Sequence, residues 1–177
     1  MKARKVKGLD PGGPLADNAA RIVGVRLDEL GSFMPRAGDP REVAALHDMR
    51  IAAKRLRYVL EVAAPLFGPY AAEAVKVVKD LQDLLGEIHD CDVQLPEVRE
   101  VLDDVVAADA AAVRAGEAAP HAPAYAGLVG VMVDLRARRD REFAAFLERW
   151  RDLEREGFTA RLRYAVTERS LAQPPPG

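Results

Sequence analysis

The sequence predicts an all-α protein built as an antiparallel bundle of five to six helices. Three observations lead to this fold class. Hydrophobic residues make up 49% of the chain and are mostly Ala, Leu and Val, whereas aromatic residues make up only 6%. No segment alternates β-branched and polar residues as a half-buried strand would. Apolar residues recur instead at spacings of three and four, the pattern of a helix that buries one face.

Gly and Pro residues separate the predicted helices. We expect residues 1–14 to form an extended basic arm and residues 172–177 to form a disordered tail. Between them we expect one bundle domain, residues 15–171, because a chain of 177 residues suits a single domain. Asp39 followed by Pro40 is a favourable helix start. The predicted helices cover residues 15–34, 39–67, 70–89, 93–113, 128–156 and 158–171.

Several classes of protein are disfavoured by simple features of the chain. The single cysteine, Cys91, excludes an intramolecular disulfide and a zinc cluster built on cysteines. The basic N-terminus is not followed by the apolar segment of a signal peptide. No uncharged apolar run is long enough to cross a membrane. We therefore expect a cytoplasmic protein without membrane contact.

The charge is unevenly distributed, although the net charge is only −2. Residues 1–60 hold 12 Lys and Arg against 7 Asp and Glu, a balance of +5. Residues 61–117 hold 4 against 13, a balance of −9, and residues 118–177 hold 10 against 8, a balance of +2. Local fields therefore matter more for recognition than the total charge does.

One predicted helix carries an unusual row of cations. In ALHDMRIAAKRLRYVLE, residues 45–61, the helical turn of about 100° per residue places four basic groups in one narrow stripe: His47, Arg50, Lys54 and Arg57. Arg55 points in another direction, and the opposite side is apolar. The stripe is either a solvated face neutralised by carboxylates of a neighbouring helix or one wall of a groove for an anion.

Two further arginines favour the groove. Arg26 and Arg139 each interrupt an apolar helical stripe, where a charge is costly unless it is paired or faces a wet pocket. Lys76 and Lys79 are weaker candidates, because carboxylates four residues later can offset them. Guanidinium and ammonium groups are the natural partners of phosphate oxygens, so these side chains together suggest a phosphate-binding groove.

A metal-dependent enzyme is the main alternative. The chain contains two His-Asp pairs, and His47, His89, Asp90 and a later acid such as Asp134 follow the order used by HD-type phosphohydrolases. Arg50, Lys54 and Arg57 share the stripe of His47, and three positive charges so close together disfavour a divalent metal there. No other catalytic motif is present, so we expect no enzyme activity, no metal and no cofactor.

Two segments resemble a known family. LHDMRIAAKRLRYVLE followed by LQDLLGEIHDCDV is similar to the CHAD domain, the conserved-histidine α-helical domain, and VKGLDPGGPLADNAARIVGVRLDEL and EREGFTARLRYAV resemble its first and closing helices. The resemblance implies a helical bundle that binds inorganic polyphosphate without catalysis, and a location at polyphosphate granules would fit it. The family's basic residues correspond here to the following positions: His47, Arg50, Lys54, Arg55 and Arg57, with Lys76 and Lys79 as weaker additions.

The chain departs from this family in one respect. Such domains usually contain two similar bundles in tandem, whereas the motif pair occurs once here. We therefore expect a homodimer in which a second chain replaces the missing half. A nucleic acid is the second candidate among polyanions, but Tyr58 alone could stack bases beside the stripe and the whole chain is acidic.

Overall fold

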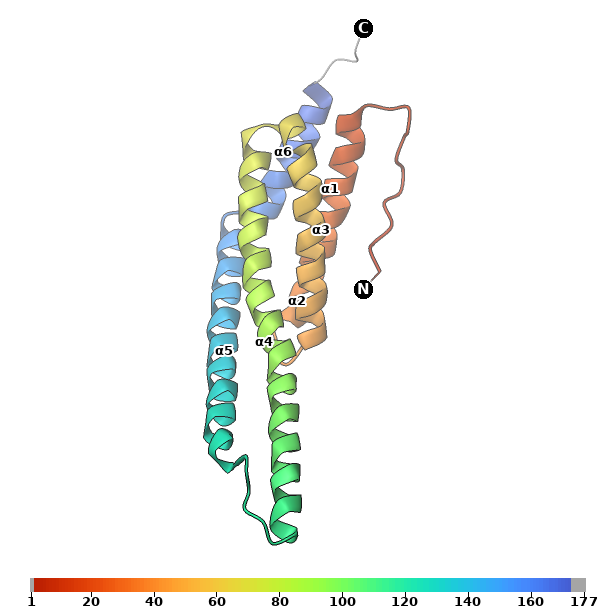
Figure 1. Ribbon diagram of the computed structural model, residues 1–177. Coiled ribbons are helices and arrows are strands. Elements are labelled where there is room, and N and C mark those ends of the chain that lie inside the picture. Colours follow the sequence, from red (N-terminus) through yellow and green to blue (C-terminus); the bar gives the residue numbers. More distant parts are fainter. Residues whose placement is uncertain (1, 173–177) are drawn as a thin grey trace. The chain divides into compact units, whose positions relative to one another are not determined.

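The computed structural model describes residues 2–172, and the side chains of residues 2–168 (Figure 1). This part of the chain forms α-helices, one short 3₁₀ helix and no strand, so the predicted all-α fold is confirmed. Apart from Ala172, which ends the last helix, the predicted tail lies outside the described residues. The elements are α1 (Leu15–Gly31), α2 (Met34–Ala37), α3 (Val43–Phe67), α4 (Pro69–Arg114), η1 (Ala122–Ala124), α5 (Tyr125–Arg155) and α6 (Phe158–Ala172).

The largest difference from the predicted elements is α4, one continuous helix where two were expected. The polar residues after His89 and the proline at position 96 suggested a break, yet the helix passes through both. Cys91 is buried, and Asp92 is ion-paired with Arg139 of α5, so this turn has partners that keep it helical. Packing therefore outweighs the hydrogen bond that Pro96 cannot donate.

The first two predicted helices also differ in their boundaries. The first ends at Gly31 and is followed by the single turn of α2. The next helix starts at Val43, because the Asp39 carboxylate accepts a hydrogen bond from the Arg41 backbone and forms a turn instead of a cap. The proline at position 65 does not end this helix, which stops at Gly68 with a φ of 81°.

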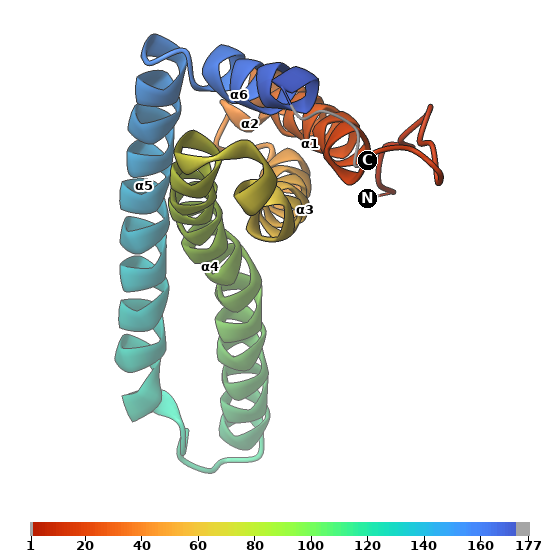
Figure 2. The ribbon, with the colours of Figure 1, turned by 90° about the horizontal axis from the view of Figure 1, so that it is seen from above.

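The helices belong to two compact units, whose boundaries fall within α4 and α5. Residues 1–86 and 145–177 form the first unit, and residues 87–144 form the second. In the first unit, α1 contacts α3 and α6, and α3 runs opposite to α1 (Figures 1 and 2). The apolar face predicted for the helix of residues 45–61 is buried here, as expected: Leu46, Met49, Ala53, Leu56 and Leu60. This unit holds the basic row of α3.

The second unit is a hairpin of the later part of α4 and the first part of α5 (Figure 1). Its inward residues recur at spacings of three and four, as in an antiparallel coiled coil. On α4 they are Leu95, Val98, Leu102 and Val105, and on α5 Leu128, Met132 and Leu135. The hairpin is therefore held by a two-helix seam whose apolar side chains are mostly only half-buried.

A buried carboxylate closes the tip of this hairpin. Asp109 accepts hydrogen bonds from the His121 backbone, at 3.1 Å, and from the Tyr125 hydroxyl, at 2.6 Å, and lies 2.7 Å from Nδ1 of His121. Burial raises the pKa of the Asp109 carboxyl, but the hydrogen bonds from Tyr125 and His121 outweigh it and hold that pKa below its ordinary value. The C-terminal part of the loop between α4 and α5 is thus anchored to α4.

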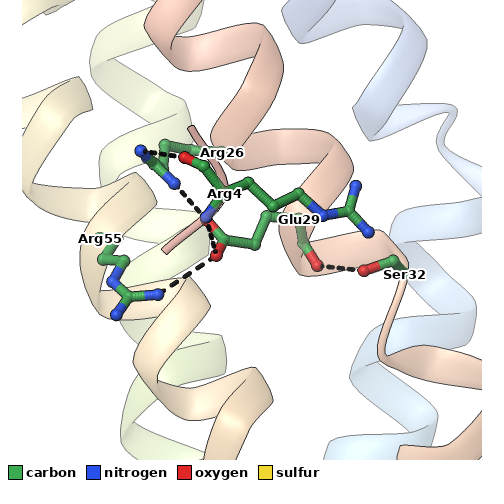
Figure 3. A network of polar contacts seen from close by, with 5 residues as sticks. All are labelled: Arg4, Arg26, Glu29, Ser32 and Arg55. Carbon is green, nitrogen blue, oxygen red and sulfur yellow. Dashed lines mark hydrogen bonds and ion pairs between the residues drawn. The ribbon is translucent and has the colours of Figure 1, made fainter. Parts of the chain in front are cut away.

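A second buried carboxylate ties the N-terminal arm to the first unit (Figure 3). Glu29 of α1 is only 1% exposed. It forms ion pairs with Arg26 and, at 3.2 Å, with Arg55 of α3, and it accepts a hydrogen bond from the Arg4 backbone at 3.1 Å. Arg26 also donates to the carbonyl of Arg4 at 3.0 Å. The predicted basic arm is therefore fastened to α1 through Arg4.

None of the helices in the described part of the chain combines the length and the apolar character needed to cross a lipid bilayer.

We predict that Glu29→Gln destabilises the protein by about 3 kcal/mol, the range expected when one partner of a buried ion pair is removed. The substitution keeps the shape of the side chain but removes the negative charge that the partly buried Arg26 and Arg55 share in Glu29. Urea unfolding followed by circular dichroism measures the difference.

The matched control is Glu42→Gln, which removes the carboxylate partner of Arg36. That pair is exposed on both sides, so the loss should stay below about 1 kcal/mol. Equal effects of the two substitutions would show that the buried network does not hold the fold.

Candidate anion-binding site

The predicted basic stripe lies along one side of α3 in the first unit. His47, Arg50 and Arg57 are half-buried, and Lys54 is exposed. Tyr58 lies beside the stripe, with its ring centre 5.7 Å from the Lys54 ammonium and 4.9 Å from the Arg57 guanidinium. The aromatic ring therefore supports the two cations from one side and restricts where their heads can point.

The adjoining part of α4 forms the second side of this site. A side-chain carbon at Gly86 would lie 3.8 Å from Nε of Arg50, so the Arg50 side chain passes over α4 where that helix has no side chain. The hydrogen bond to Asp83 raises the pKa of Lys79, and the nearby charge of Arg57 acts in the opposite direction. Arg57 and Lys79 are therefore close enough for their charges to act on each other across the two helices.

The closeness of Arg50 to Gly86 and the effect of Arg57 on Lys79 together indicate an antiparallel arrangement of α3 and α4. Arg57 follows Arg50 by seven residues, and Lys79 precedes Gly86 by seven, as helices running in opposite directions require. Gln82 lies between Lys79 and Gly86 on α4, and Lys54 lies between Arg50 and Arg57 on α3. We refer to this row of residues as the α3–α4 seam: Arg50, Lys54, Arg57, Lys79, Gln82 and Gly86.

The seam contains every buried side-chain nitrogen or oxygen that lacks a hydrogen-bond partner in the described part of the chain. These atoms are Nε of Arg50, Nε of Arg57 and Oε1 of Gln82. Nε of Arg57 does lie 3.1 Å from the Glu61 carboxylate, but that ion pair lacks hydrogen-bond geometry. Buried polar atoms are almost always satisfied in folded proteins, so three exceptions in one seam indicate a place where a ligand or water would bind.

Carboxylate partners divide the remaining predicted residues into two groups. Lys76 pairs with Glu73 at 3.2 Å and Lys79 pairs with Asp83 at 2.8 Å, both on the exposed surface of α4. In contrast, no carboxylate pairs with Arg50 or Lys54 anywhere in the described part of the chain. The positive charge of the seam is therefore least compensated on these two residues, one helical turn apart.

Besides His47 and Lys76, three predicted arginines lie outside the seam. Arg26 and Arg55 both hold Glu29, so their apolar surroundings are explained by a structural ion pair. Arg139 belongs to the second unit, where it is 9% exposed and pairs with Asp92. Each of these three arginines forms an ion pair with a carboxylate of the protein.

Two seam residues were not predicted as part of the site. Gln82 and Gly86 are not basic, so a search for cations passes over them. The signal was present in their spacing, since they follow Lys79 by three and seven residues and thus share its side of the helix. A side-chain carbon at position 86 would lie at ordinary van der Waals distance from Arg50, so Gly86 marks where Arg50 approaches α4 without being required for that approach.

The residues of the alternative metal site lie in different units. His47 is in the first unit, whereas His89, Asp90 and Asp134 are in the second. No three His, Cys, Asp or Glu side chains of the described residues gather where they could hold a metal ion. Both His47 and His89 already take part in interactions within the chain.

Comparison with known proteins identifies the family. No curated protein and no solved structure gave a significant match. The family model of the CHAD domain, however, matches residues 3–99, more than half of the 177-residue chain. This range contains the whole α3–α4 seam, and CHAD domains in general bind polyphosphate. The chain therefore belongs to the CHAD domain family.

Proposed function

We propose that this protein binds inorganic polyphosphate, without catalysis, along the α3–α4 seam. The observation that carries the proposal is the state of Arg50 and Lys54. Both are cations without a carboxylate partner in the described part of the chain, and Nε of Arg50 is a buried donor without an acceptor. An anion at this point would neutralise the charge and satisfy the donor together.

The shape of the row also suits an extended anion. From His47 to Arg57 the cations cover ten residues of helix, which corresponds to about 15 Å. A flexible polyphosphate chain carries roughly one charge per phosphate, so it can follow such a row without any reading of bases. Arginine binds phosphate oxygens through a planar fork and lysine as a point charge, and the seam contains both.

Single-stranded RNA is the competing polyanion. Tyr58, at 46% exposure, is available beside the row, but both neighbouring cations already lie over its ring. Non-specific single-strand binding sites usually offer several aromatic platforms along a groove. The seam provides one, so it favours an anion without bases.

We expect Arg50→Glu combined with Lys54→Glu to weaken polyphosphate binding at least about 100-fold. Two charge-assisted contacts are lost, each worth about 1.5–3 kcal/mol, and two repulsive charges replace them. Isothermal titration calorimetry with long-chain polyphosphate measures the affinity, and circular dichroism checks that helicity is retained.

The control for this variant is Arg141→Glu combined with Arg151→Glu. It produces the same change in net charge at two exposed positions of α5, and its affinity should change less than about threefold at physiological salt, where separated surface charges are screened. If both double variants weaken binding equally, the net charge of the protein and not the seam determines the affinity.

Binding should depend on salt and discriminate between polyanions. Four contacts to phosphate, for a flexible single chain, correspond to a slope of about −3 in a plot of log affinity against log salt. Polyphosphate should also resist displacement by single-stranded RNA added at equal phosphate concentration. Complete displacement by RNA would identify the site as a nucleic-acid site.

The absence of catalysis is tested separately. We expect no phosphate release from long-chain polyphosphate, with or without Mg²⁺ or Mn²⁺, over many hours at neutral pH. Metal-dependent release that is lost in His89→Ala would instead support the HD-type phosphohydrolase, since that enzyme would need its histidines as ligands.

A further inference from the structure

The hairpin of residues 87–144 exposes an unusual number of apolar side chains. Thirteen large apolar side chains are exposed in the described part of the chain, and seven of them belong to this unit. All seven are valines: Val93, Val101, Val106, Val113, Val129, Val131 and Val133. Valine is a weak helix former when nothing packs against it. Its concentration in these two helices therefore suggests that part of the hairpin surface packs against another protein surface.

A groove of about 250 Å³ lies between α4 and α5 on one side of the hairpin. Leu95 and Leu102 of α4 and Met132 of α5 form its floor, and Val129 and Val133 line it from α5 with 47% and 61% of their surface exposed. The groove is therefore open to a partner, and it runs along the seam of the coiled coil.

Three charged residues also line this groove. They are Arg99 and Asp103 on α4 and Arg136 on α5. All three are exposed, and none has an ion-pair partner within the described residues. In contrast, the charges that hold the hairpin together are paired, since Arg138 pairs with Glu87 and Arg139 with Asp92. The groove thus offers both an apolar centre and unpaired charges of both signs.

We propose that this groove is the interface through which two copies of the chain associate. Two hairpins packed face to face form a four-helix bundle, the usual way for half-buried heptad positions to become fully buried. A surface that carries both signs of charge around an apolar centre can be complementary to itself, which is what a two-fold interface requires. A partner with a single charge sign could not pair both Arg99 and Asp103.

The positions of the charges also select the orientation of the two copies. Arg99 and Asp103 are one turn apart on α4. A two-fold axis that crosses the helices midway between them, with the hairpin tips pointing in opposite directions, places α4 on α4. Asp103 of each copy then meets Arg99 of the other. The arrangement with tips in the same direction would place α4 on α5 and Asp103 against valines.

This interface is independent of the anion site. The sequence led us to expect that a second chain completes the polyphosphate groove, but the hairpin interface uses none of the α3–α4 seam residues. Its test can therefore be read without any ligand, and failure of polyphosphate binding would not affect it.

The first experiment measures mass by light scattering during gel filtration, up to millimolar concentrations of the full chain. We expect a dimer for the natural protein and a monomer for Val129→Glu combined with Val133→Glu. The control is Val43→Glu combined with Val62→Glu, two exposed valines of α3, which should remain dimeric. A natural protein that is monomeric throughout overturns the proposal, as does a dimer that survives in the hairpin variant.

A charge exchange provides the second test, and it does not depend on the apolar substitutions. Asp103→Arg and Arg99→Asp should each weaken the dimer at least about tenfold, because each creates two like-charge contacts across the two-fold axis. The two substitutions combined restore opposite charges and should restore most of the affinity. Additive weakening in the combined variant would show that these residues do not meet across the interface.

Discussion

The structure depends on one constraint, which is that a charge buried among helices must be neutralised inside the bundle. Glu29 shows how strongly this acts. Its carboxylate, almost completely buried, gathers two arginines and a backbone amide, and in doing so it joins the N-terminal arm, α1 and α3. Without partners, a buried carboxylate would cost several kcal/mol of folding free energy. The hydrogen bond from the Arg4 backbone amide to this carboxylate therefore holds the arm next to α1.

The same constraint explains the hairpin, where two polar positions interrupt the apolar seam. Asp92 pairs with Arg139 near the end of the hairpin away from its tip, and Asp109 accepts hydrogen bonds from the loop at the tip. Sliding α5 along α4 by one heptad would separate both carboxylates from their partners while still matching apolar residues. Polar positions of this kind are known to fix the register of coiled coils. The stability of the hairpin thus comes from the seam, and its alignment comes from the carboxylates.

The sequence predicted the fold class, the buried face of α3 and the basic stripe, because each of these is a periodic property of one helix. It did not predict the carboxylate partners of three arginines. The partners of Arg55 and Arg139 lie on other helices, and the partner of Arg26 is Glu29, one turn further along the same helix. It also divided α4 into two, because proline and acidic residues signal a break unless distant side chains support them. Gln82 and Gly86 were missed for a related reason, as their meaning depends on what α3 places opposite them.

Charge pairing also separates structural cations from functional ones more sharply than position in the sequence does. Arg50 and Arg55 lie on the same helix, and both belong to the motif that resembles the family. Arg55 is held by the buried Glu29, so moving it onto a ligand would leave that carboxylate undercompensated. Arg50 has no carboxylate to abandon and one buried donor to satisfy, so binding an anion lowers its free energy without a competing loss. The binding energy of the site should therefore come from the cations that the fold leaves unpaired.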